Sequence, residues 1–322
     1  MPSWLMRRLA TAVATFVLLT FLLHAAVRWL PGEPITTDEP GTGGAQTLTL
    51  RPDASPVEES YLRWMGQLAR LDLGVSIAVM PGRPVTSLLR DALPWSLWLG
   101  ALAMIATFAT AIPLAALSAR RPLSAGSRAV SAALYLLQAL PVFWVALVLQ
   151  HLIAVRMAWL PLMGPGGSGP THDGAWPGAP AHWVLPCAAL ALGSLALAIR
   201  LCRDALESVA RAPLSRAARA RGASLDRVMM THGLSGAAVP MVSLAALMLP
   251  GLVSGSVLVE SIFALPGAGR LLYVAASRRD APVLLGVCLL AAAATLAASV
   301  LADAAYRLLD PRTRHDGSKA AA

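Results

Sequence analysis

Charged side chains are scarce in this sequence: they make up 13% of 322 residues, and lysine occurs once, as Lys319. Hydrophobic residues account for 57%, and the mean hydropathy is +0.63. Soluble domains carry about 25% charged residues, so this composition indicates a chain that lies in lipid. A net charge of +9 would suggest nucleic acid for a soluble protein. Basic loops of a membrane protein give the same total, and we expect no nucleic-acid partner.

The near absence of lysine also excludes one source of energy. A phosphate-binding loop for ATP needs the pattern G-x-x-x-x-G-K-[ST], whereas Lys319 is followed by Ala320. We therefore expect that the chain does not hydrolyse ATP and that energy arrives from a partner.

Cysteine and histidine are few and scattered. The three cysteines show no C-x-x-C spacing and predict structural thiols without a disulfide framework: Cys187, Cys202 and Cys288. Four histidines lack the spacing that metal ligands require: His24, His151, His172 and His182. We expect no metal site, no cofactor and no enzyme activity.

Long hydrophobic runs, by contrast, are abundant. A bilayer core needs about 20 apolar residues in a helix. Six stretches meet this need: 9–30, 94–119, 130–155, 183–201, 239–263 and 282–306. They predict an all-α integral membrane protein with six transmembrane helices. The first run is interpreted as an uncleaved helix, although Ala25-Ala26 near its end leaves a cleavable signal peptide open.

The segments between the runs define the predicted organisation. The expected parts are the N-terminus with the first helix (1–30), a periplasmic excursion (31–93), a core with helices two to six (94–311) and a tail (312–322). The excursion is rich in Pro, Gly and acidic residues, with a short helix expected around Tyr61 to Leu71.

Arginines predict the orientation of the chain. Most fall in loops on one side of the arrangement, within 7–8, 120–128, 200–227 and 307–319. By the positive-inside rule that side is the cytoplasm, and an even number of spans places both termini there. A bacterial inner membrane as the location is implied by the family resemblance described below.

The largest cytoplasmic loop, about 204–232, has the features of a helix, a turn and a second helix. Pro213 suits the first turn of a helix, Gly222 suits its C-terminal cap, and Ser224 suits the N-cap of the next helix. An ordinary basic loop beside anionic membrane lipid would also fit this composition.

A resemblance favours the first interpretation. The stretch resembles the EAA loop of ABC-importer permeases, in the form of the peptide and nickel branch, in Arg216, Ala217, Ala218, Arg219, Ala220, Arg221 and Gly222, followed by His232 and Pro240. The resemblance implies that this segment is the coupling helix, which inserts into a groove on an ATPase subunit. Gly222 would allow the sharp turn between the helices.

The likeness extends over nearly the whole chain. Further matching elements are Asp72-Leu73-Gly74-x-Ser76, Leu140-Pro141-Val142-Phe143-Trp144, Leu265-Pro266-Gly267-x-Gly269, Arg279-Asp280-x-Pro282 and Asp310-Pro311-Arg312. Two positions depart from the family pattern: Leu214-Ser215 replaces an aromatic residue, and Gly236 replaces an asparagine. The departures concern the packing of the loop and not the fold.

The resemblance implies a transport subunit that forms a pore and works by alternating access, with peptides as the expected substrate and nickel or another small solute as the alternative. The partners that it implies are a second homologous permease, two ATP-binding subunits and a periplasmic or lipid-anchored substrate-binding protein.

Three residues outside the loop are candidates for helix packing or for the transport pathway. Gly251 and Gly255 give the fifth predicted helix a small-residue face, suited to an intersubunit seam or to internal packing. Glu260 is an ionisable group at the end of that helix, and we favour a structural role at the outer turn over substrate contact.

Two other classes of membrane protein would require features that differ from those of this sequence. A membrane hydrolase would need its nucleophile and base in facing membrane helices, whereas Ser224 falls in the basic loop. A secondary transporter would be expected to show inverted repeats and broken helices, and no convincing repeat is visible in the sequence.

Overall fold

The computed structural model describes residues 2–28, 57–120, 124–164, 179–222, 224–228, 233–254 and 256–309. Within these ranges the chain is helical, apart from connecting segments and an isolated antiparallel bridge between Val75 and Pro84. In chain order the helices are α1 (Pro2–Arg28), α2 (Val57–Leu68), α3 (Val85–Arg120), α4 (Ala125–Ala139), α5 (Val142–Leu149), the π-helix η1 (Gln150–Arg156), α6 (Ala181–Arg211), α7 (Pro213–Ala220), α8 (Leu225–Val228), α9 (Leu234–Ser254), α10 (Val257–Ile262), α11 (Ala268–Arg278) and α12 (Ala281–Leu309).

Four described helices are long and apolar enough to cross a membrane: Ala10–Val27, Val85–Ala119, Ala181–Arg211 and Ala281–Ala305. A fifth span results if Arg128–Ala139 and Val142–Arg156 count as one bent element. The all-α membrane class is therefore shown, whereas the sixth span stays a prediction, because the apolar part of α9 covers only Pro240–Gly251.

The third predicted span, 130–155, is broken, and Pro141 accounts for the position of the break. The two halves meet at an angle of 104°. Pro141 has φ −61° and ψ 138°, an extended conformation, so the helix cannot continue through it. Its carbonyl then accepts hydrogen bonds from the N–H groups of Trp144 and Val145, which start α5.

Two other boundaries differ from the predicted ones. Helix α3 begins at Val85, ahead of the expected start at 94. The prediction followed the apolar run, whereas the helix also includes the charged residues Arg90 and Asp91 ahead of that run. The fifth predicted segment, 239–263, is divided into α9 and α10, with Ser256 extended at the start of α10 (φ −100°, ψ 100°). Glu260 consequently lies in a separate short helix.

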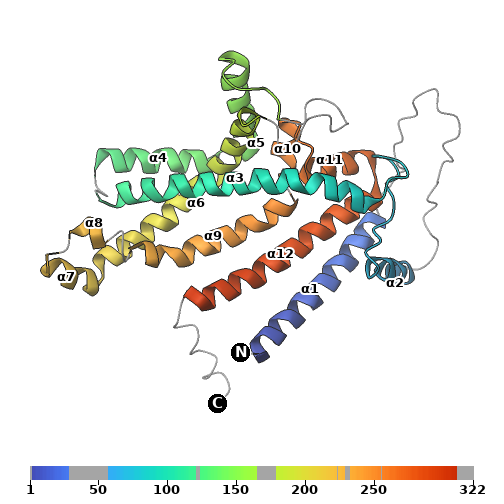
Figure 1. The fold of residues 1–322 in the computed structure, drawn as a ribbon, viewed down its shortest axis with the longest axis horizontal. Helices are drawn as coiled ribbons and strands as arrows, with labels where there is room; N and C mark the ends of the chain where they lie inside the picture. The colour runs from blue at the N-terminus through green and yellow to red at the C-terminus, as the bar shows by residue number, and fades with distance from the viewer. Residues whose placement is uncertain are drawn as a thin grey trace. The chain divides into compact units, whose positions relative to one another are not determined.

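The chain divides into two compact units, one made of 1–98 and 250–297, the other of 99–249 and 298–322. In the first unit the core joins the start of α3 to α11 and α12 through Val85, Leu88, Leu89, Ala275, Val283 and Val287. In the second unit, small residues of α3 pack at helical spacing against α6 and α9, and this core contains Ala111, Ala115, Ala119, Leu195, Ala198, Ile199, Cys202, Leu206, Ala237 and Leu244. Helix α4 also packs on α6 in this unit (Figure 1).

Candidate coupling element and buried carboxylates

The segment α7–α8 follows directly on the last turn of α6 (Figure 1). Ala212 is extended (φ −63°, ψ 148°), which ends α6, and Pro213 occupies the first position of α7. Proline suits that position because its missing N–H would have no partner inside the helix. Gly222 then has φ +90°, a conformation that favours glycine, and the chain turns into α8. A turn with a positive φ at Gly222 therefore follows α7.

The Ser215 side chain holds the start of α7 against α6, and Arg216 beside it is exposed. Ser215 is 1% exposed and donates its hydroxyl to the carbonyl of Val209 on α6. This contact gives a structural role to one of the positions that departs from the family pattern. Arg216, Ala217 and Arg221 are exposed, as a surface that binds another protein would require.

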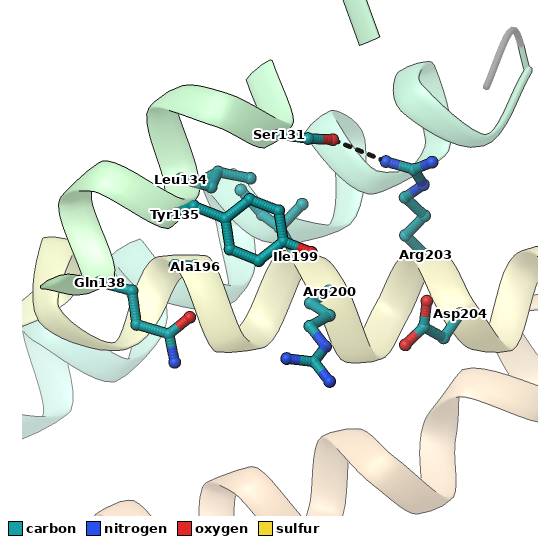
Figure 2. Close-up of a pocket in the computed structure, with 9 residues that line it drawn as sticks. All are labelled: Ser131, Leu134, Tyr135, Gln138, Ala196, Ile199, Arg200, Arg203 and Asp204. Carbon is teal, nitrogen blue, oxygen red and sulfur yellow. Dashed lines mark hydrogen bonds between the residues drawn. The ribbon is translucent and has the colours of Figure 1, made fainter. Parts of the chain in front are cut away.

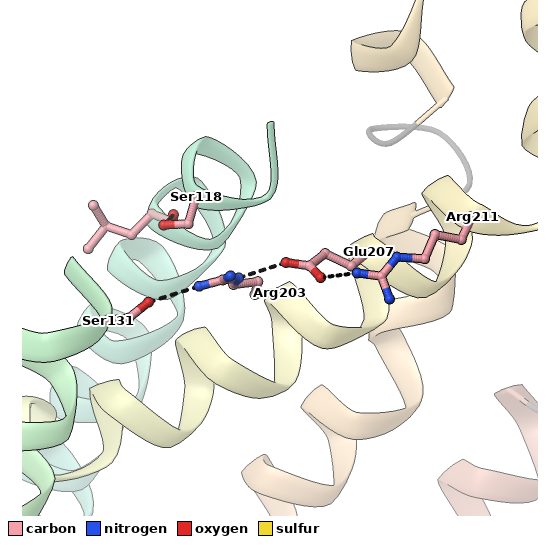
Figure 3. A network of polar contacts seen from close by, with 6 residues as sticks. Ser118, Ser131, Arg203, Glu207 and Arg211 are labelled. Atoms are coloured by element: carbon pink, nitrogen blue, oxygen red, sulfur yellow. Dashed lines mark hydrogen bonds and ion pairs between the residues drawn. The ribbon is translucent and has the colours of Figure 1, made fainter. Parts of the chain in front are cut away.

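Three polar contacts join side chains near the end of α6 from which α7 departs (Figure 3). Glu207 accepts hydrogen bonds from Arg203 Nε and Arg211 Nη2, both at 2.8 Å. Arg203 Nη1 also donates to Ser131 Oγ on α4 at 2.9 Å. Each i,i+4 ion pair contributes only about 0.3–0.5 kcal/mol, so the contacts orient the arginines more than they stabilise the fold.

The other residues predicted for coupling and packing are placed as follows. Ala218 and Arg219 lie in α7, and Pro240 lies half-buried in α9. His232 and Gly255 lie outside the described residues. Gly251 is exposed on α9, and a Cβ built there would have no heavy atom within 4 Å.

Glu260 is 1% exposed and acts as an anchor for the N-terminus of α11. Its Oε2 accepts hydrogen bonds from the backbone N–H groups of Gly269 (2.9 Å) and Arg270 (3.1 Å). Its Oε1 accepts from Ser96 Oγ of α3 (2.9 Å) and from the Ser256 N–H (3.1 Å). The first N–H groups of a helix have no partner within the helix, so a carboxylate satisfies them and complements the helix dipole.

The two glycines of the Leu265-Pro266-Gly267-x-Gly269 element make room for this carboxylate. A Cβ on Gly267 would lie 2.6 Å from Ser96 Oγ, and one on Gly269 would lie 2.7 Å from the backbone nitrogen of Val257. Ser96 also accepts a hydrogen bond from the Ala268 N–H at 2.8 Å. The motif is thus explained by packing around Glu260.

Asp280 forms a second anchor in the same unit and is 0% exposed. Its Oδ2 accepts hydrogen bonds from Ser76 Oγ (2.6 Å) and from the N–H groups of Ile77 (3.1 Å), Ala78 (2.9 Å) and Val79 (2.9 Å). Successive N–H groups of this kind form a concave anion site, here filled by a side chain. The carboxylate joins two family elements that the sequence showed only separately, since Ser76 and Asp280 are 204 residues apart.

The anchoring roles of Ser96 and Asp280 were missed at the level of sequence. Both residues are fully or almost fully buried, at 1% and 0% exposure. Polar residues in apolar surroundings were the available signal, but their partners lie far along the chain. Among the described residues, no group of three or more His, Cys, Asp or Glu side chains could hold a metal ion.

Comparisons with known proteins agree with this architecture. The family model described as "Binding-protein-dependent transport system inner membrane component" matches residues 111–315. The oligopeptide transport system permease protein AppB of Bacillus subtilis is 30% identical over 98% of this chain and 100% of its own length. The dipeptide transport system permease protein DppB of Escherichia coli is 31% identical, over 98% of this chain and 99% of its own length.

A solved structure is similar in fold. A chain of the MetNI methionine ABC transporter, in inward-facing conformations, has a TM-score of 0.55 at 19% identity and covers 70% of this chain and 97% of its own. With the full-length relatives and the family match over its core, the chain belongs to the family of inner-membrane components of binding-protein-dependent transport systems.

Proposed function

We propose that this chain is the pathway-forming membrane subunit of an ATP-driven importer of di- or oligopeptides. As a member of its family it is a transport component and not an enzyme, and ATP hydrolysis belongs to a separate subunit. The coupling role is supported by the α7–Gly222–α8 element. Ser215 ties this element to α6, and Arg216 and Arg221 on it are exposed. The peptide assignment is supported by the full-length similarity to two peptide permeases.

In the proposed mechanism the α7–α8 turn inserts into a groove on the ATPase. Ser215 ties this turn to α6, so a movement of the turn is passed to a membrane-spanning helix. ATP binding favours one of two conformations only if the two differ in their binding free energy. Closure of two ATPase subunits would supply that difference and reopen the pathway to the other face.

The proposed topology places α7, α8 and both termini in the cytoplasm. It counts α9 as a sixth span and the bent α4–α5 element as one span. Arginines at the end of α6 and in α7 support this orientation by the positive-inside rule. In this arrangement a second homologous permease would complete the pore, and an external binding protein would deliver the substrate.

An uptake assay tests the function and separates its alternatives. A strain that lacks the gene is supplied with labelled dipeptides, longer peptides and nickel ions, and uptake is compared with that of the complemented strain. The proposal predicts restored peptide uptake, abolished when ATP is depleted. Restored nickel uptake without peptide uptake would favour the alternative substrate, and uptake that is insensitive to ATP would contradict an ATP-driven importer.

A further inference from the structure

The coupling mechanism does not use a pocket that lies between α4 and α6 (Figure 2). Its volume is about 230 Å³, whereas one water molecule needs only about 10–15 Å³, so a small organic molecule fits. Tyr135 and Gln138 of α4 line one side, and Arg200, Arg203 and Asp204 of α6 line the other. The pocket therefore combines an aromatic ring, an amide and charges of both signs.

The two charges at its opening have no partners within the described part of the chain. Arg203 is held by Ser131 and Glu207 and points toward α4. Arg200 and Asp204 are exposed, and neither makes a hydrogen bond or an ion pair with any described residue. Figure 2 shows both side chains directed away from Ser131, together with Gln138.

A cation and an anion at i,i+4 could pair with each other, but the structure does not pair them. The order matters here, because an acidic residue ahead of a basic one gives the better helical pair, and Arg200 precedes Asp204. Four residues of helix separate the two positions along the axis by about 6 Å. The pocket thus presents a positive and a negative group about one helical turn apart.

Ligand chemistry follows from that separation. A phosphate group would pair with Arg200 but would meet the carboxylate of Asp204. A zwitterion satisfies both groups. Two extended peptide residues span at most about 7 Å, close to the distance between the two positions.

We propose that this pocket is a subsite of the transport pathway, where a short peptide binds with its carboxylate on Arg200 and its ammonium group on Asp204. The inference rests on the proposed function and adds a location and residue roles to it. Arg200 supplies a planar guanidinium that can hold a carboxylate by two hydrogen bonds. Arg203 already contacts Ser131 and Glu207, so it lines the subsite and does not hold the ligand.

The test is uptake of labelled dialanine into proteoliposomes that contain the complete transporter and saturating binding protein. Arg200→Gln and Asp204→Asn should each lower the maximal rate at least tenfold, with unchanged half-saturation by the binding protein. Arg128→Gln is the matched control, since Arg128 is an exposed arginine on α4 that does not line the pocket. It should transport at the wild-type rate.

Four results would overturn the subsite while leaving peptide transport by the wild type intact. The first is that both variants keep more than half of the wild-type rate. The second is uptake of dialanine amide, which has no carboxylate, at the rate of dialanine, which would mean that Arg200 does not hold a ligand carboxylate. The third is loss of the other transporter subunits during purification of either variant. Arg200 and Asp204 would then belong to an interface between subunits. The fourth is a wild-type rate that falls to the level of Arg200→Gln when phosphatidylglycerol is omitted, which would assign Arg200 to lipid. A wild type that transports no peptide would instead contradict the proposed function itself.

Discussion

Two sites, one in each unit of the chain, use charge in opposite ways. In the first unit, Glu260 and Asp280 are almost fully buried, and each is surrounded by hydroxyl and backbone N–H donors. In the second unit, Arg216 and Arg221 are exposed on a short helix and its turn. A buried carboxylate that accepts hydrogen bonds from backbone donors holds the fold together. An exposed arginine on a helix that is fixed at its start is available to a partner. The difference predicts which substitutions lower the stability of the fold and which leave it unchanged.

Loss of the Glu260 carboxylate should have the largest effect on stability. Glu260→Ala would leave the N–H groups of Ser256, Gly269 and Arg270 without their acceptor. A buried donor without a partner costs about 1–3 kcal/mol, so we expect a total loss of at least about 3 kcal/mol. The measurements are membrane abundance and the melting temperature in detergent.

The control for Glu260 is Asp91→Ala. Asp91 forms an ion pair with Arg83 in which both side chains are more than one third exposed. Surface pairs of this kind contribute about 0–1 kcal/mol, so the melting temperature should hardly change. Equal melting temperatures for Glu260→Ala and Asp91→Ala would contradict the anchoring role of Glu260.

Replacement of Asp280 should have a smaller but still clear effect. Asp280→Asn retains one acceptor oxygen for the N–H groups of Ala78 and Val79 but loses the negative charge, and we expect a loss of about 1–3 kcal/mol. Ser76→Ala removes one donor to the same oxygen. Because the two residues share this contact, the double variant should be less destabilised than the sum of the single ones. Strict additivity in thermal unfolding would show that the contact is absent.

Gly269 and Gly251 differ in the space around a Cβ, so the stabilities of their alanine variants can be compared. Gly269→Ala places a methyl group 2.7 Å from a backbone nitrogen, and overpacking of this kind costs about 1–3 kcal/mol. Gly251→Ala meets no atom within 4 Å and should not lower stability. Similar melting temperatures for the two variants would mean that Glu260 and α11 can shift to accept the added methyl group.

Exposed arginines should have the smallest effect on stability. The combined change Arg216→Gln and Arg221→Gln is expected to leave the melting temperature unaltered, because both side chains are exposed. The amount of ATPase that copurifies should nevertheless fall. A stable variant with a full complement of ATPase would show that these arginines are not part of the docking surface.

Local signals in the sequence predicted the local structure. Pro213 and Gly222 mark the bounds of α7 because one lacks an N–H and the other accepts a positive φ. The break at Pro141 was not predicted, since proline alone does not decide it: Pro186 lies inside the continuous helix α6. The Ser96–Glu260 contact depends on residues 164 positions apart, and no local pattern reveals such a pair.

The most direct test of the account is the substitution Gly222→Val, compared with Gly82→Val. Both glycines have positive φ, +90° and +80°, and neither has an atom within 4 Å of a built Cβ. A β-branched residue in this conformation costs about 1–3 kcal/mol at either position. We expect normal membrane abundance for both variants, with ATPase copurification and peptide uptake lost only for Gly222→Val. Normal uptake by an abundant Gly222→Val protein would contradict it, and the α7–α8 segment would then be an ordinary basic loop beside the lipid.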